Sequence, residues 1–180
     1  MKIVILLFKS IYDKIFYLRI LFGSAYEIPR ILSKKYGFKV GENCRFTGKK
    51  ISFGSEPYLI EIGNNVTITP GVKFETHDGG VGILRKEYPG INVFGRIKIG
   101  NNVFIGEDSM IMYGVSIGND VVIGARSVVT KDIPPYTVAA GTPARVIRSL
   151  EEYKQRSLNK AIYVFSSSAK LRKKEILSKI

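Results

Sequence analysis

Hydrophobic residues recur at every sixth position across the stretch from residue 99 to residue 133. The recurring positions are Ile99, Ile105, Ile111, Ile117, Ile123 and Val129. This spacing differs from the 3.6-residue period of a helix and from the simple alternation of a long strand. A short unit that repeats at a fixed period is typical of a solenoid.

Each six-residue unit contains two hydrophobic or small residues separated by one residue that faces the other way. In an extended segment Val103 and Ile105 point to one side and Phe104 to the other. The same pairing recurs as Ser109/Ile111, Val115/Ile117, Val121/Ile123 and Ser127/Val129. Between these segments lie residues 106–108, 118–120 and 124–126, which are rich in the Gly, Asn and Asp of tight turns. The pattern predicts a parallel β-helix of short strands and corners.

The same rhythm begins less regularly at Val40. Val40 and Phe46 are in step and Ile51 slips by one, as expected where early coils cap a solenoid. The interval from Phe74 to Ile99 is not a multiple of six, so residues 75–96 must leave the wall and rejoin it. Five glycines and a proline predict a loop there, and long loops on rigid scaffolds often carry function.

The two ends lie outside the repeat. We expect a helical segment over residues 1–39, a β-helix domain over 40–148 and a basic helical tail over 149–180, which Ser166–Ser168 split in two. Charges interrupt the apolar run near the start, which argues against a membrane-crossing helix and against a signal peptide. Two interpretations of this first segment remain. It forms a helix on the outer face or between subunits, or residues 1–22 lie as an amphipathic helix on the inner membrane surface. For the tail, we expect a cap over the open end of the β-helix.

Charge is concentrated at the same two ends. The 180 residues carry a net charge of +13, of which residues 1–39 contribute +6, residues 40–148 +2 and residues 149–180 +5. This distribution favours an anionic neighbour at the termini, and no nucleic-acid-binding signature is present. The single cysteine, Cys44, excludes an internal disulfide and favours a reducing, cytoplasmic location. Its place in the repeat predicts a buried packing residue.

The closing segment of the repeat carries a resemblance to a known family. Residues 128–148 read Val-Val-Thr-Lys-Asp-Ile-Pro-Pro-Tyr-Thr-Val-Ala-Ala-Gly-Thr-Pro-Ala-Arg-Val-Ile-Arg. With the repeats before it, this segment resembles the hexapeptide-repeat acyltransferases over roughly residues 40–148. The resemblance implies a mainly β fold, a three-sided left-handed parallel β-helix, which works as a homotrimer and takes acetyl-CoA as its acyl donor. No metal is expected.

His77 is the only histidine, and it lies where the predicted loop departs. Imidazole exchanges a proton near neutral pH, as a base that activates an attacking hydroxyl must. In the family a histidine at the matching place is the general base. Residues 76–80, Thr-His-Asp-Gly-Gly, with Leu84-Arg85 resemble capsule and surface-polysaccharide O-acetyltransferases in particular, although Gly82 stands where relatives often carry Trp. Asp78 and a backbone carbonyl are both candidates for orienting the ring.

The resemblance also assigns residues to the acyl donor. Phe104 and the backbone at Glu107 would lie beside the pantetheine arm of CoA, and the backbone at Ala125 would bind one of its amides. The remaining positions match groups that reach the CoA phosphates and adenine; they are Lys131, Arg145 and Arg148. Without the resemblance, these three cations are equally consistent with ordinary solvent-exposed charges at the corners of a β-helix.

These observations favour an acetyl-CoA-dependent O-acetyltransferase acting on a sugar hydroxyl, in capsule, O-antigen or exopolysaccharide biosynthesis. An N-acetyltransferase of an amino sugar or nucleotide sugar is the alternative enzyme, since an amine also needs only one base. A non-catalytic β-helix scaffold is the alternative from another class. A zinc carbonic anhydrase on the same fold requires three histidines, which one histidine per chain does not supply.

Overall fold

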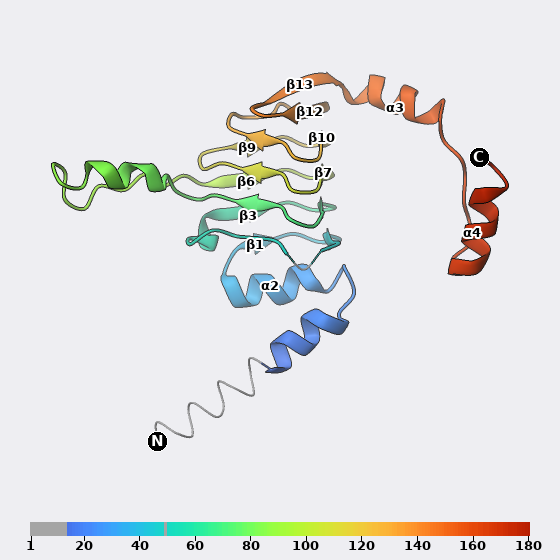
Figure 1. Ribbon diagram of the computed structural model, residues 1–180, viewed down its shortest axis with the longest axis horizontal. Coiled ribbons are helices and arrows are strands. Elements are labelled where there is room, and N and C mark those ends of the chain that lie inside the picture. Colours follow the sequence, from blue (N-terminus) through green and yellow to red (C-terminus); the bar gives the residue numbers. More distant parts are fainter. Residues whose placement is uncertain (1–13, 49) are drawn as a thin grey trace. The chain divides into compact units, whose positions relative to one another are not determined.

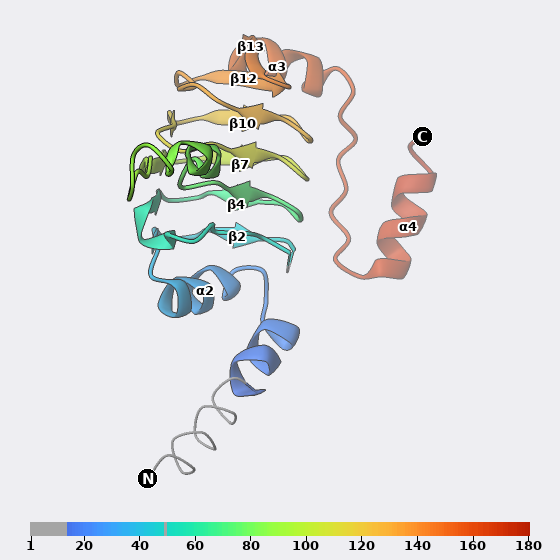
Figure 2. The ribbon, with the colours of Figure 1, turned by 60° about the vertical axis from the view of Figure 1, so that its left-hand side comes forward.

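The hydrophobic repeat folds into three sheets, which form the three walls of a β-helix (Figure 1, Figure 2). The structure is a computed structural model that describes residues 14–48 and 50–180. The first wall contains β1 (Lys39–Val40), β3 (Ile60–Ile62), β6 (Ile97–Ile99) and β9 (Ser116–Ile117). The second contains β2 (Arg45–Phe46), β4 (Thr67–Ile68), β7 (Val103–Ile105), β10 (Val121–Ile123), β12 (Thr137–Gly141) and β13 (Ala144–Ser149). The third contains β5 (Lys73–Phe74), β8 (Met110–Ile111) and β11 (Val128–Val129).

Strand register gives the length of each coil. Lys98 pairs with Ser116 and Phe104 with Val122, so a regular coil advances by eighteen residues, or three six-residue units. Thr67 pairs with Phe104, thirty-seven positions further on. This step is nineteen residues longer than a regular coil. The extra residues are the insertion that the broken rhythm between Phe74 and Ile99 predicts. All pairs within the walls are parallel except β12 with β13, which closes the last coil as a hairpin.

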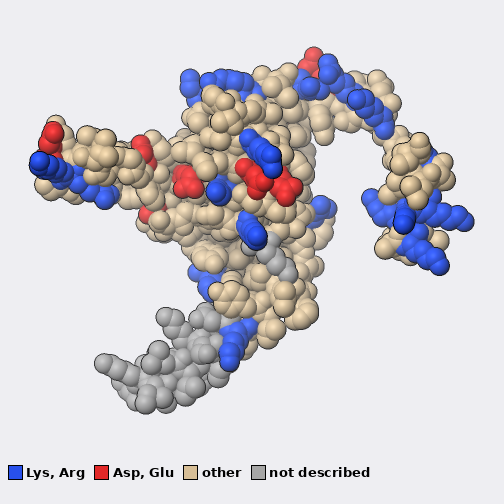
Figure 3. Space-filling model, viewed as in Figure 1, with Lys and Arg blue, Asp and Glu red and all other residues tan. Residues whose placement is uncertain are grey.

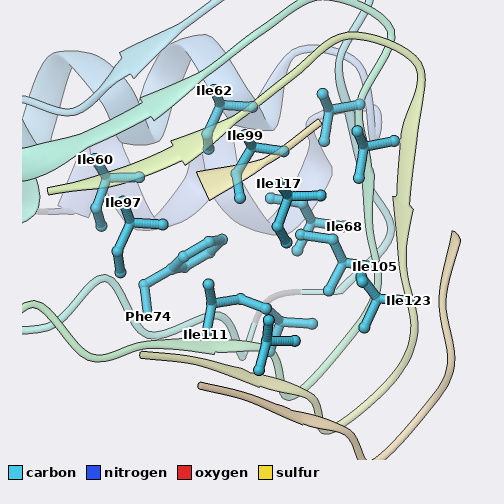
Figure 4. Packing of buried hydrophobic residues seen from close by; sticks show 14 of the residues in the cluster. Ile60, Ile62, Ile68, Phe74, Ile97, Ile99, Ile105, Ile111, Ile117 and Ile123 are labelled. Atoms are coloured by element: carbon cyan, nitrogen blue, oxygen red, sulfur yellow. The ribbon is translucent and has the colours of Figure 1, made fainter. Parts of the chain in front are cut away.

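The inward positions form the core. All six residues of the period, from Ile99 to Val129, are at most 4% exposed, and so are the small or hydrophobic partners that precede each of them. Figure 4 shows isoleucines of successive coils stacked in columns, such as Ile60 with Ile97, around Phe74. Cys44 is also buried, as predicted, and burial raises the pKa of its thiol.

Each corner needs one residue with positive φ. Asn102, Asp108, Asp120 and Arg126 hold this place with φ between 55° and 57°. At the corner between the first and second walls, asparagine side chains link the coils. The Oδ1 atoms of Asn64, Asn101 and Asn119 accept from the backbone N–H of Glu42, Asn64 and Asn101 over 2.7–2.8 Å. Corner side chains thus hold one coil above the next.

The first complete coil is less regular than the rest. Phe53 takes the inward place there, while Ile51, which the six-residue rhythm puts one step out of register, is only partly buried. The ring of Phe53 stacks on Phe38 at 4.2 Å and on Phe74 at 5.7 Å between centroids. An aromatic stack therefore fills the wider beginning of the solenoid.

Helices precede the first coil. Residues 14–22 are helical, and α2 (Ile28–Tyr36) follows and ends at Gly37, whose φ is 84°. Ile28 belongs to the hydrophobic core, so α2 covers the beginning of the β-helix. Among the described residues no helix is long and apolar enough to cross a membrane. The predictions that concern residues 1–13 lie outside the part of the chain that the structure describes.

Contacts divide the chain into two units, Met1–Leu150 and Glu151–Ile180. The second unit contains most of α3 (Leu150–Leu158) and all of α4 (Ala169–Leu177), and Ser166–Ser168 fall between the two helices. The Glu175 carboxylate accepts from the backbone N–H groups of Phe165 and Ser166, which folds the end of the tail on itself. Basic side chains gather over α4 (Figure 3). The expected capping of the β-helix by this tail stays a prediction.

Candidate active site

The inserted loop leaves the β-helix at the corner between the third and first walls. A short antiparallel neck holds its base, because Gly95 N–H donates to the Thr76 carbonyl at 3.0 Å and Asp78 N–H donates to the Val93 carbonyl at 2.9 Å. His77 pairs with Phe94 within this neck. Beyond it the loop forms the 3₁₀ turns η2 (Gly79–Leu84) and projects from the body of the β-helix (Figure 1). His77 therefore lies in the hydrogen-bonded base of the loop.

A carboxylate from the previous coil orients the imidazole. Oε2 of Glu56 lies 2.9 Å from Nδ1 of His77 and accepts a 2.7 Å hydrogen bond from the hydroxyl of Thr76. The bond from Thr76 and the weaker one from His77 lower the pKa of Glu56. An ionised carboxylate is only an acceptor, so Nδ1 carries the proton and Nε2 has its lone pair free.

The free nitrogen is accessible. The His77 side chain is 35% exposed, whereas its partner Glu56 is 16% exposed. Gly79 lies beside Nε2, and a Cβ at this position would come no closer to Nε2 than 3.9 Å, an ordinary contact distance. Phe94 stands edge-on to the imidazole at 6.0 Å between centroids and is half exposed. A hydroxyl group can therefore approach Nε2 from solvent beside an aromatic ring.

Asp78 has a different role from the one that the sequence suggested. Its Oδ1 accepts from the N–H of Gly80 at 2.8 Å and so begins η2, and its Oδ2 accepts from the Tyr113 hydroxyl at 3.2 Å. The charge of Asp78 raises the pKa of Tyr113. Asp78 thus ties the loop to the next coil. Neither it nor a backbone carbonyl orients His77.

Glu56 was not identified from the sequence, because only the strand register of the folded chain relates it to His77. Ser52 pairs with Lys73, twenty-one positions further on, and Glu56 precedes His77 by the same interval. The two residues are therefore equivalent positions of successive coils. The irregular spacing before Ile62 hid this register.

Three of the predicted donor residues share the second wall and the corner that follows it. Phe104 points outward from β7 beside its paired neighbours Thr67 and Val122, in a shallow groove that Leu150 also lines. Glu107 and Ala125 occupy that corner in successive coils, where the Glu107 carbonyl accepts from the N–H of Arg126 at 2.7 Å.

The three predicted phosphate-binding cations are divided between two places. Arg148 on β13 pairs with Val138, which belongs to the row of Phe104. Arg145 lies on the same strand and donates from Nη1 to the Ala144 carbonyl at 2.8 Å. Lys131 instead lies at the corner between the third and first walls, where the loop that carries His77 departs. It follows Tyr113 by eighteen residues, which is the length of one regular coil. Within one chain, the third wall separates His77 and Lys131 from the other donor residues.

The part of the chain that the structure describes holds no group of three or more His, Cys, Asp or Glu side chains able to bind a metal ion. The site is thus an imidazole, its carboxylate and an exposed aromatic ring.

Comparison with known proteins agrees with this architecture. The model of the bacterial transferase hexapeptide family (six repeats) matches residues 96–131. Protein CapG of Staphylococcus aureus is 54% identical over 131 residues, which cover 72% of this chain and 76% of CapG. The crystal structure of a maltose O-acetyltransferase from Clostridium difficile 630 is similar with a TM-score of 0.53 and 36% identity, over 67% of this chain and 73% of that one. A galactoside acetyltransferase in complex with coenzyme A is similar with a TM-score of 0.57 and 31% identity, over 87% of this chain and 85% of that one.

The three walls, the six-residue period and these relatives together confirm the fold and the resemblance that the sequence predicts. The chain belongs to the hexapeptide-repeat acyltransferases, which fold as left-handed parallel β-helices.

Proposed function

We propose that this protein is an acetyl-CoA-dependent O-acetyltransferase that acts on a sugar hydroxyl, in capsule, O-antigen or exopolysaccharide biosynthesis. The observation that carries the proposal is the pair of Glu56 and His77, in which a carboxylate holds Nδ1 and leaves Nε2 open to solvent. Relatives of similar fold named as maltose and galactoside acetyltransferases support a sugar as the acceptor.

The reaction requires one base that becomes an acid. Nε2 of His77 takes the proton of the acceptor hydroxyl while the oxygen attacks the carbonyl carbon of the thioester. His77 thereby becomes an imidazolium, which the Glu56 carboxylate stabilises through Nδ1–H, while the negative charge forms on the oxygen of the former thioester carbonyl. When the tetrahedral intermediate collapses, the C–S bond breaks, the sulfur of CoA takes the proton from Nε2, and the acetyl ester remains on the acceptor.

The acyl donor would bind along the second wall and its following corner. Phe104 offers apolar contact to pantetheine, and the backbone at Glu107 and Ala125 offers hydrogen bonds. The phosphates and adenine would lie near cations, for which a guanidinium or ammonium group is suited. These are Lys131 and Arg145, which are exposed, and Arg148, which is partly buried.

The separation of these groups supports a homotrimer. In one chain, His77 and the corner of Ala125 lie on opposite sides of the third wall. Cyclic closure of three copies brings the corner of one subunit to the neighbouring wall of the next, so that one acetyl-CoA would contact both.

Mixed trimers of a His77→Ala chain and a chain defective at Ala125 should then recover part of the activity that each homotrimer lacks. Failure to recover activity in verified mixed trimers would place both halves of the site on one chain.

The chemical stability of the product distinguishes acetyl transfer to a hydroxyl from acetyl transfer to an amine. The protein should be incubated with labelled acetyl-CoA and acceptors that range from free and nucleotide sugars to lipid-linked oligosaccharides. An O-acetyl ester is cleaved by hydroxylamine, whereas an N-acetyl amide is stable. Hydroxylamine-labile label on a sugar is the expected result. Stable label would favour the N-acetyltransferase, and no transfer to any acceptor would favour the scaffold.

We also propose a cytoplasmic location with peripheral contact to the membrane through residues 1–22. In the described part of this segment, Ile15, Leu18 and Phe22 are more than half exposed beside Lys14 and Arg19, a combination that suits an anionic lipid surface. The full chain should pellet with vesicles that contain anionic lipid, and a variant with Leu18→Glu and Phe22→Glu should pellet less. Equal pelleting of both proteins would reject the contact.

A further inference from the structure

Two buried serines distinguish one corner of the β-helix from the rest of the core. Ser109 and Ser127 occupy equivalent inward places of successive coils just before the third wall, and both are 0% exposed. Register with the coil before them puts Val72 at the same place. Valine is thus compatible with this position, so packing alone does not explain the hydroxyl groups.

Both hydroxyl groups bind the same backbone carbonyl. The carbonyl oxygen of Gly124 accepts from Oγ of Ser127 at 2.6 Å and from Oγ of Ser109 at 3.0 Å. Oγ of Ser127 also accepts from the N–H of Gly141 at 3.1 Å. The Gly124 carbonyl therefore points into the solenoid and is held there by two donors.

A planar trans peptide transmits this orientation to the next residue. The C=O of Gly124 and the N–H of Ala125 belong to one peptide unit and point in opposite directions. Because the carbonyl points inward, the Ala125 N–H points outward, and Ala125 itself is exposed. One coil earlier the Gly106 carbonyl accepts from the backbone N–H of Ser109 at 3.3 Å, which turns the N–H of Glu107 outward in the same way.

We propose that Ser109 and Ser127 are positioning residues that aim the Ala125 N–H at a carbonyl of the pantetheine arm. The inference rests on the proposed function, because it concerns the acyl donor of that same site. Removal of both hydroxyl groups leaves the Gly124 carbonyl buried without these donors, a state that favours rotation of the peptide toward water. The N–H then no longer points at the donor.

The N–H itself is tested by proline. Ala125→Pro removes the N–H and changes little else, since Pro70 holds the equivalent place two coils earlier, as the register of β4 with β7 and β7 with β10 shows. We expect the dissociation constant for acetyl-CoA to rise about tenfold, which corresponds to the loss of roughly one hydrogen bond. An unchanged constant would remove the amide of Ala125 from the donor site.

The serines are tested by replacing them with the residue of the earlier coil. The double variant Ser109→Val/Ser127→Val should raise the acetyl-CoA dissociation constant roughly five- to tenfold, and Ser127→Thr, which retains a hydroxyl group, should bind nearly as the wild type does. Ser33→Ala is the matched control. It also removes a hydroxyl donor to a backbone carbonyl, that of Phe38 at 2.6 Å, but in α2 before the first coil, so it should leave the dissociation constant unchanged.

The outcomes separate this inference from the proposed function. Wild-type protein that fails to bind acetyl-CoA would overturn the proposed function. Weak binding by Ala125→Pro together with wild-type binding by the double valine variant would overturn only the role of the serines. If the double variant does not fold, the single variant Ser127→Val decides, because it removes the shorter of the two hydrogen bonds to the Gly124 carbonyl. A raised acetyl-CoA dissociation constant supports the inference, and an unchanged one contradicts it.

Discussion

Glu56 and His77 occupy equivalent positions of successive coils, with Oε2 of the carboxylate 2.9 Å from Nδ1 of the imidazole. The β-helix itself makes this contact, because stacking brings residues of one corner into register. Thr76 donates to the same Oε2 and is completely buried, so the carboxylate is fixed before any substrate binds. A single histidine on an exposed loop thereby obtains the orientation that a general base requires.

Replacing Glu56 with Gln should slow turnover without abolishing acetyl-CoA binding. The amide does not stabilise the imidazolium as the carboxylate does, so we expect kcat to fall at least tenfold, but by less than the roughly 10²–10⁴-fold contribution of the general base itself. Because the pKa of Glu56 is lowered, the carboxylate stays ionised well into the acid range in the wild type. Steady-state kinetics measured across a range of pH give both the fall in kcat and the pH range over which the ionised Glu56 supports turnover. Glu61→Gln is the control, since its carboxylate pairs with Lys39 on the first wall, and equal losses in both variants would contradict the assignment.

Replacing Lys131 with Ala should weaken acetyl-CoA binding more than it slows the chemical step. The side chain is exposed at the corner of His77, where a cation would meet the phosphates of a donor held between two subunits. Calorimetric titration with CoA, compared with kcat at saturating donor, separates the two effects. Lys98→Ala removes the same charge from the first wall and should leave the CoA dissociation constant unchanged. A wild-type constant for the Lys131 variant would exclude it from the donor site.

The folded end of the tail should open in acid. Backbone and side-chain hydrogen bonds from Ser166, with that from Phe165, lower the pKa of Glu175 to about 2, against 4.5 for the free group. A lowered pKa means that the ionised carboxylate stabilises the folded form, so this stabilisation is complete above pH 4.5 and is lost as the pH falls toward 2. Hydrogen exchange of the Phe165 and Ser166 amides, corrected for the intrinsic rate, should show protection lost over that range. A Glu175→Gln variant should lack this protection of the two amides at every pH. Protection that survives at pH 2 in the wild type would contradict the role of the Glu175 carboxylate.

The regular coils could be read from the sequence because their period is a steric requirement. Each coil needs two inward residues per wall and one positive-φ residue per corner, and Val103, Ile105 and Asp108 meet those needs in sequence order. Irregular coils give no such guide. Phe53 and Glu56 lie where residues are inserted, so neither the inward place of the one nor the contact of the other follows from counting.

The grouping of the candidate donor residues also required three dimensions. Phe104, Ala125 and Lys131 are near one another in sequence, yet the third wall separates the first two from the last. Strand register assigns each to its corner, and only the folded chain shows that His77 shares the corner of Lys131. The orientation of the Ala125 N–H depends on two serines that the sequence presents only as small inward residues.

The most direct test of the account is turnover by a His77→Ala variant. We expect acetyl transfer from acetyl-CoA to the acceptor sugar to fall by roughly 10²–10⁴-fold, while the oligomeric state and the acetyl-CoA dissociation constant stay at their wild-type values. A variant that assembles, binds acetyl-CoA and transfers acetyl groups at the wild-type rate would contradict the central role of His77.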